Sequence, residues 1–147
     1  MSKVCLPVHA VINTYCRKMT LDQNHIRTVY SFIYSMLKER RLHLYRIGGI
    51  ENHIHMLFDL GSNFALADVM RDVKRESSKM IQNTGKFPLF EGWGKEYFAI
   101  GRSPESVGDV IEYIKNQPIH HNRICFEDEM KEFLAQGGFT WSDVLLT

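Results

Sequence analysis

The stretch Glu51-Asn52-His53-Ile54-His55-Met56-Leu57-Phe58-Asp59-Leu60 decides the fold of this chain. Its polar and apolar side chains alternate, which is typical of a β-strand with one buried face. Side chains two residues apart on a strand point the same way and lie ~6.6 Å apart along the chain. His53 and His55 therefore share one face and can reach a single metal ion. The other face carries four apolar side chains that we expect in a core: Ile54, Met56, Phe58 and Leu60.

The same spacing has a simpler interpretation. Histidine is often only partly buried, so two histidines on one strand face frequently bind nothing. The spacing of His53 and His55 permits a metal site without establishing one. Other parts of the chain must therefore supply further evidence.

Length and composition limit the classes of protein. The 147 residues predict a single domain over 1–147, which can bury about two-thirds of its unfolded surface. No run approaches the ~18 apolar residues of a membrane span, and the N-terminus lacks an apolar signal region. We therefore expect a cytoplasmic protein without a membrane partner. The formal net charge of +1 gives no general attraction to a polyanion, so a nucleic acid would need a local basic patch.

The three cysteines Cys5, Cys16 and Cys125 are odd in number and far apart in the sequence. None of them belongs to a C-x-x-C pair, which argues against a zinc knuckle and against a disulfide framework. We expect reduced thiols in ordinary buried or half-buried positions.

The spacing of apolar residues, together with capping residues, glycines and prolines, predicts the remaining helices and strands. Thr20-Leu21-Asp22-Gln23 has the form of a capping box that opens a helix. Gly48-Gly49 and Glu51-Asn52 are both candidates for the turn before the histidine strand. Pro118 disfavours helical geometry at Gln117, so the third helix should end or kink there. In order, we expect a strand over 8–15, a helix over 20–40, strands over 42–50 and 53–60, a helix to about 83, a strand over 96–100, a helix over 103–117 and a helix over 126–136.

This order of strands and helices predicts an α+β fold. Strand, helix, strand, strand, helix, strand is the split βαβ pattern of a ferredoxin-like, RRM-like sheet, here with additional C-terminal helices. We expect the helices to cover one sheet face and His53 and His55 to lie on the open face. Tyr113 and Gln117 are four residues apart on the third helix and can face the same site. Asn13 and Tyr15 would share the open face.

The second helix gathers basic side chains on one flank. Such a flank is usually a solvated surface, and contact with nucleic-acid phosphates is the functional alternative. The candidates for that contact are Arg71, Lys74, Arg75 and Lys79. Trp93 and Tyr97 can either stack on bases or belong to the core, and the core is the better default.

Four short motifs follow one another in the order found in one known family of proteins. His53-Ile54-His55 resembles the histidine, hydrophobic, histidine motif of that family. Lys74-Arg75-Glu76-Ser77-Ser78-Lys79 resembles its K-x-x-S-S-K/R helix, and 93–100 resembles its W-x-x-x-Y-F strand. Tyr113-Ile114-Lys115-Asn116-Gln117 with His120-His121 is similar to its Y-I-x-N-Q-x-x-H-H segment. Over about residues 8 to 135 the chain thus resembles the single-tyrosine HUH transposases of bacterial insertion sequences and REP-associated tyrosine transposases.

The resemblance implies a function and a role for each matching residue. Tyr113 would be the catalytic nucleophile, and His53, His55 and Gln117 would bind a divalent metal, Mg²⁺ or Mn²⁺. The enzyme would be a DNA transposase that cuts and rejoins single-stranded DNA at hairpin-flanked ends through a 5′-phosphotyrosine intermediate. A homodimer is also implied, with the site completed within one subunit or between subunits.

Three other interpretations stay open. The same order of elements fits a non-catalytic nucleic-acid-binding module of RRM-like fold. A domesticated transposase that binds DNA without cutting it has the same sequence features. A small zinc enzyme would need a third protein ligand beside His53 and His55, and the sequence gives no clear one. Lys115, His120 and His121 lie near the tyrosine in the sequence, but we expect them to be exposed polar residues at the end of a helix. The sequence therefore identifies no general base.

Overall fold

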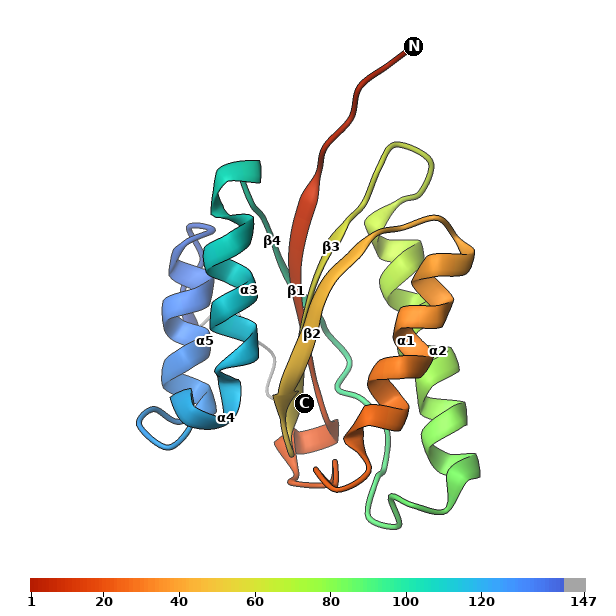
Figure 1. The fold of residues 1–147 in the computed structure, drawn as a ribbon. Coiled ribbons are helices and arrows are strands. Elements are labelled where there is room, and N and C mark those ends of the chain that lie inside the picture. The colour runs from red at the N-terminus through yellow and green to blue at the C-terminus, as the bar shows by residue number, and fades with distance from the viewer. Residues whose placement is uncertain (142–147) are drawn as a thin grey trace.

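A four-stranded antiparallel sheet with the order β2-β3-β1-β4 runs through the middle of the molecule (Figure 1). This computed structural model describes residues 1–141. The strands are β1 (Pro7–Asn13), β2 (Leu44–Ile50), β3 (His53–Asp59) and β4 (Phe98–Gly101). The predicted α+β, ferredoxin-like fold is confirmed. The histidine strand β3 is an inner strand, so its position is fixed by neighbours on both sides.

Helices lie on both sides of the sheet (Figure 1). On one side are α1 (Ile26–Glu39) and α2 (Leu66–Thr84). On the other side are α3 (Val107–Lys115), α4 (Gln117–His120) and α5 (Phe126–Ala135). The expectation of one open sheet face is therefore wrong. The C-terminal helices cover that face because α5 is amphipathic and buries Phe126, Met130 and Phe133 against it.

Alternation along the strands divides the core into two clusters. The larger cluster lies between the sheet and helices α1 and α2, and Ile54, Met56 and Phe58 of β3 belong to it, as predicted. The smaller cluster lies between the sheet and α5, around Val11 of β1. His53 and His55 point into this second layer and are fully buried. The sheet therefore holds the two imidazoles under a cover of helices and not in open solvent.

One detail of the predicted elements is wrong, one is decided between two candidates, and one is confirmed. Thr20 to Gln23 is not a capping box, because the Gln23 side chain donates to the Leu21 carbonyl and α1 begins only at Ile26. Gly48 and Gly49 lie inside β2, and the turn into β3 is at Glu51-Asn52. The break before Pro118 is confirmed, since α3 ends at Lys115 and α4 begins at Gln117.

The two glycines of β2 allow close packing around the histidine strand. A Cβ on Gly48 would lie 3.1 Å from the carbonyl oxygen of Ile114 in α3, the helix that carries Tyr113. A Cβ on Gly49 would overlap the carbonyl oxygen of His53. The backbone thus leaves no room for a side chain at Gly49, whereas a Cβ at Gly48 would need Ile114 to shift slightly.

Replacing Gly49 by alanine should be severely destabilising. Its Cβ would overlap backbone that cannot move without shifting β3, so we expect a loss of about 3 kcal/mol or more in the free energy of unfolding. Chemical denaturation measures this. Gly101→Ala in β4 is the matched control, because nothing lies within 4 Å of its Cβ position. Equal stability of the two variants would show that the β2-β3 hairpin is looser than described here.

Candidate active site

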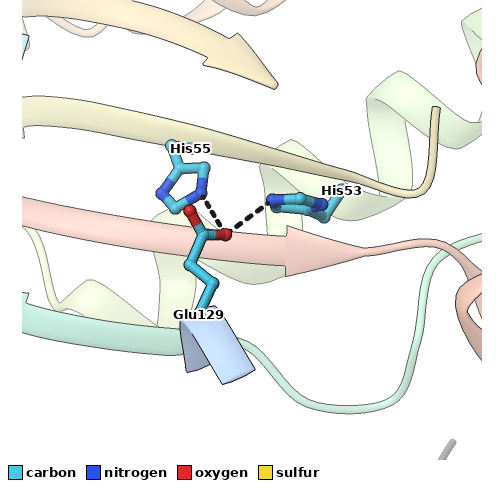
Figure 2. Close-up of side chains that lie close together, drawn as sticks. All are labelled: His53, His55 and Glu129. Carbon is cyan, nitrogen blue, oxygen red and sulfur yellow. Dashed lines mark hydrogen bonds and ion pairs between the residues drawn. The ribbon is translucent and has the colours of Figure 1, made fainter. Parts of the chain in front are cut away.

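One carboxylate, that of Glu129 on α5, is the meeting point of side chains from β3, α3 and α4 and of His121 just after α4. Figure 2 shows Glu129 reaching towards the two histidines of β3, with both ring nitrogens directed at the same carboxylate oxygen. Its Oε1 lies 3.0 Å from His53 Nε2 and 3.3 Å from His55 Nε2. His121 Nε2 lies 3.0 Å from the same oxygen. Glu129 was not predicted from the sequence, and it organises the site.

The second oxygen of Glu129 binds the two candidates on the neighbouring helices. Gln117 Nε2 donates to Oε2 over 2.7 Å, and the Tyr113 hydroxyl donates to the same atom. The structure therefore brings Tyr113, Gln117, His53 and His55 together within one chain. A homodimer is not required to assemble these side chains, and the prediction of a dimer stays a prediction.

His53 is arranged as a ligand for a cation. Its Nδ1 lies 2.8 Å from Asn52 Oδ1, an acceptor, so the proton of the neutral ring is on Nδ1. The lone pair of Nε2 then faces Gln117 Oε1 at 3.2 Å and Glu129 Oε1 at 3.0 Å. Three electron-rich atoms that converge without a proton between them fit a divalent cation. Burial lowers the pKa of His53 to about 4, against an opposing effect of Glu129, so the ring is neutral near pH 7.

The group His53, His55 and Glu129 has the geometry of a metal site. One ligand atom from each residue lies within 4.8 Å of the others. Imidazole and carboxylate together suit divalent ions such as Mn²⁺, Mg²⁺ and Zn²⁺. The structure thus supplies the third ligand whose absence from the sequence counted against a zinc enzyme.

The charge state of the buried carboxylate follows from its donors. Burial by itself raises the pKa of Glu129, but hydrogen bonds from His121 and His55 outweigh burial and hold the pKa well below its ordinary value. Glu129 is therefore ionised. Burial and the adjacent Glu129 charge raise the pKa of the half-buried Tyr113 phenol, so in this structure the phenol keeps its proton.

Two residues that no motif indicated lie behind His55. His9 of β1 is buried, and its Nε2 lies 2.8 Å from His55 Nδ1. Arg102, just after β4, places Nη2 at 3.3 Å from His9 Nδ1. Alternation along the first strand gives His9 the same face as Asn13, but a single histidine carries no further signal in the sequence.

Acid should destabilise the metal-free protein through these buried histidines. Burial lowers the pKa of His9 to about 2 and that of His53 to about 4, both from an ordinary value of 6.5. The unfolded chain therefore binds protons below about pH 6.5 that the folded protein does not bind. We expect the free energy of unfolding to fall from about pH 6.5 towards pH 4, by up to ~1.4 kcal/mol per pH unit for each histidine.

Denaturation in EDTA at several pH values measures this slope. The variant His9→Phe should show a shallower decline, because one of the two buried rings can no longer take up a proton on unfolding. Constant stability between pH 6.5 and pH 4 would contradict the neutral, buried state of the two rings.

The sequence model of the family described as "Transposase IS200 like" matches residues 2–117. This chain belongs to the IS200-like transposase family. The match covers Tyr113 at its C-terminal end and both histidines. Glu129 and α5 lie beyond it. No curated protein sequence gives a significant match.

Two solved structures resemble the fold of this family member. A protein assigned as a transposase in Deinococcus radiodurans R1 superimposes with a TM-score of 0.62 and 19% identity, covering 79% of this chain and 93% of that chain. A REP-associated tyrosine transposase, solved bound to a REP hairpin, gives a TM-score of 0.62 with 15% identity, covering 84% of this chain and 76% of that chain. At these identities the likeness concerns the fold.

The basic candidates of this transposase lie on α2, on the other side of the sheet from Glu129. Arg71 pairs with Asp68 at 3.0 Å, and Arg75 pairs with Asp72 at 3.1 Å. Lys74 donates to the carbonyl of Lys95. A groove of about 530 Å³ runs along this flank. It is lined by Ala67, Arg71, Lys74, Arg75, Ser78, Gly92, Trp93, Gly94, Lys95 and Tyr97.

The aromatic pair beside this groove belongs mainly to the core. Trp93 is 9% exposed, and its Nε1 donates to Ser77 Oγ. Tyr97 is half-buried and packs against the larger cluster. The preference for core over base stacking is confirmed for Trp93.

No helix among residues 1–141 has the length and apolar character that a membrane crossing needs.

Several other expectations for this transposase are wrong. His121 is not an exposed helix-end residue, since its side chain is 7% exposed and binds Glu129. Tyr15 lies beyond β1 in a short 3-10 helix and is exposed, so it does not share the site with the buried Asn13. The cysteines are free, as expected, but all three are exposed and not buried.

Proposed function

We propose that this transposase cuts and rejoins single-stranded DNA through a covalent bond between Tyr113 and a 5′-phosphate. The observation that carries the proposal is the convergence of the Tyr113 phenol, the Gln117 amide and the two imidazoles of β3 on Glu129. A nucleophile and a candidate metal site share one buried carboxylate. Membership of a transposase family gives the reaction class in which such an arrangement is used.

The chemistry explains why a tyrosine is needed. The Tyr113 oxygen forms a bond to phosphorus while the bond from phosphorus to the 3′ oxygen breaks, and the departing end takes up a proton to become a 3′-hydroxyl. The phosphotyrosine keeps the energy of the phosphodiester, so attack by a 3′-hydroxyl can reseal a strand without ATP. Glu129 Oε2 accepts a hydrogen bond from the phenol and so holds the attacking oxygen beside the proposed metal site.

A divalent metal would be held by His53 Nε2, His55 Nε2 and oxygen atoms of Gln117 and Glu129. When bound, such an ion neutralises charge on the phosphate oxygens and orients them. A carboxylate and an amide oxygen suit Mg²⁺ and Mn²⁺, and the imidazoles favour Mn²⁺ of the two. Glu129 has one oxygen towards the histidines and the other towards Tyr113, so it can serve both groups at once.

Single-stranded DNA with hairpin ends is the proposed substrate. A flexible strand can bring its phosphate to a phenol that lies among three helices, whereas a rigid duplex cannot. The basic flank of α2 is the proposed phosphate contact outside the active site, through Arg71, Lys74, Arg75 and Lys79. Arg71 pairs with the exposed Asp68, and such a surface ion pair exchanges readily for a phosphate.

A covalent-adduct experiment tests the proposal. Single-stranded oligonucleotides from the inverted repeats beside the gene are incubated with the protein and Mn²⁺, and the products are separated on a denaturing gel. We expect a 3′-terminal label to become attached to protein and a 5′-terminal label to leave on a shortened strand. EDTA and a fully duplex version of the same sequence should prevent the adduct. Binding of the hairpin without any adduct would favour a domesticated, non-catalytic DNA-binding protein.

A further inference from the structure

The two histidines of β3 differ in what holds the ring nitrogen that faces away from Glu129. His53 Nδ1 faces an acceptor, the oxygen of Asn52, which leaves its Nε2 free to bind a cation. His55 Nδ1 faces another imidazole, that of His9. The tautomer of His55 therefore depends on the tautomer of His9. Of the two histidines, only His55 can therefore change the position of its ring proton together with a neighbour.

Arg102 determines the direction of this short chain of hydrogen bonds. A guanidinium can only donate, so His9 Nδ1, at 3.3 Å from Arg102 Nη2, must accept. The neutral His9 ring then carries its proton on Nε2 and donates it to His55 Nδ1 over 2.8 Å. His55 in turn carries its proton on Nε2 and donates to Glu129 Oε1 at 3.3 Å. In this arrangement Nε2 of His55 has no lone pair for a metal.

Binding of a metal by His55 requires the opposite arrangement. With Nε2 as ligand, the neutral ring must carry its proton on Nδ1 and donate it to His9 Nε2. His9 would then carry its own proton on Nδ1, directly opposite the N–H of Arg102. Two donors cannot share this contact, so Arg102 must leave His9 before His55 can become a full ligand.

The surroundings of Arg102 give it room to move. Its Nη1 donates to Gln136 near the end of α5, while its buried Nε has no hydrogen-bond partner among residues 1–141. Beside it lies a cavity of about 180 Å³ that reaches Tyr113. Asp109 and Glu132 also line this cavity and offer carboxylates to a displaced guanidinium.

We propose that Arg102 and His9 are positioning residues that decide whether His55 donates a proton to Glu129 or binds the metal. The inference rests on the proposed metal site and adds a regulator to it. The structure is the form in which Arg102 donates to His9, so that His53 can bind a metal and His55 cannot. Displacement of Arg102 completes the site.

Metal affinity of matched variants tests this role. Binding of Mn²⁺ is titrated by electron paramagnetic resonance in the absence of DNA. Arg102→Met keeps much of the side-chain volume and removes the donor, so we expect Mn²⁺ to bind several-fold more tightly. Arg102→Lys restores a donor and should return the affinity towards that of the unaltered protein. His9→Phe removes the acceptor that His55 needs as a ligand and should weaken binding about 10- to 100-fold.

The double variant separates positioning from simple packing. In the His9→Phe protein, Arg102→Met should have no further effect on Mn²⁺ affinity, because the chain of hydrogen bonds is already broken. A purely structural role of Arg102 would instead weaken Mn²⁺ binding in both backgrounds. Tighter binding that persists in the His9→Phe background would also overturn the proposal, since it could not pass through His9.

Nuclear magnetic resonance of ¹⁵N-labelled histidines tests the tautomers directly. In the metal-free protein we expect the ring proton on Nε2 of both His9 and His55 and on Nδ1 of His53. Saturation with Zn²⁺, a diamagnetic probe, should move the protons of His9 and His55 to Nδ1. A metal-free His55 with its proton already on Nδ1 would overturn this inference alone. Failure of the unaltered protein to bind Mn²⁺ or Zn²⁺ would overturn the proposed metal site together with it.

Discussion

Tyr113→Phe is expected to eliminate the covalent protein–DNA adduct while the protein stays folded. The change removes one oxygen, and that oxygen is the atom that would bond to phosphorus. Loss of an attacking group lowers turnover by several orders of magnitude, so the adduct should decrease by at least about 10⁴-fold. Quantification of the labelled adduct on a denaturing gel measures the effect, and hairpin binding should be nearly unchanged.

The control for this variant is Tyr34→Phe. Tyr34 is an exposed tyrosine of α1, on the other side of the sheet, so its hydroxyl should not matter for cutting. Thermal unfolding of both variants verifies that the protein stays folded when Glu129 loses the hydrogen bond from Tyr113. An adduct of normal yield from Tyr113→Phe would mean that another residue attacks the DNA.

Glu129→Gln is expected to weaken both the metal site and the cutting reaction. The substitution keeps the size of the side chain but removes the negative charge from a point where three imidazoles, an amide and a phenol meet. We expect Mn²⁺ affinity to fall by about 100-fold or more, since changes outside the ligand shell alone cost 10- to 100-fold. The adduct should form more slowly even at saturating Mn²⁺, because the carboxylate that holds the phenol oxygen is lost.

Glu127→Gln on the same helix is the matched control. Its carboxylate is exposed and pairs only weakly with Lys131, so neither Mn²⁺ affinity nor adduct formation should change. Mn²⁺ titration and single-turnover adduct kinetics measure the two effects separately. Faster cutting by Glu129→Gln would contradict the roles of Glu129 as metal ligand and as acceptor for the phenol. It would show instead that the Glu129 carboxylate blocks the site.

Local patterns of the sequence predicted most of the sheet and half of the site. Alternation in β3 correctly separated Ile54, Met56 and Phe58 from His53 and His55, because strand periodicity depends on the backbone alone. The position of Tyr113 and Gln117 near the histidines followed from the order of elements and the resemblance. These four residues belong to motifs whose members lie close together in the sequence, so a single sequence is enough to recognise them.

The missed residues are those whose roles arise only in three dimensions. Glu129 lies in an ordinary amphipathic helix, and nothing in its neighbours distinguishes it from the exposed Glu127. Its burial follows from the docking of α5 on the sheet face that was expected to be open. His9 and Arg102 lie behind His55, on β1 and just after β4, and single residues at such separations leave no pattern in one sequence.

Identification of the amino acid that carries the DNA tests the central claim most directly. After reaction with a single-stranded hairpin, the protein is digested with trypsin and nuclease, and the modified peptide is located by mass spectrometry. We predict one nucleotide 5′-phosphate on the peptide of residues 103–115, whose single tyrosine is Tyr113. The same modification on a peptide that carries any other tyrosine, with 103–115 unmodified, would contradict the account.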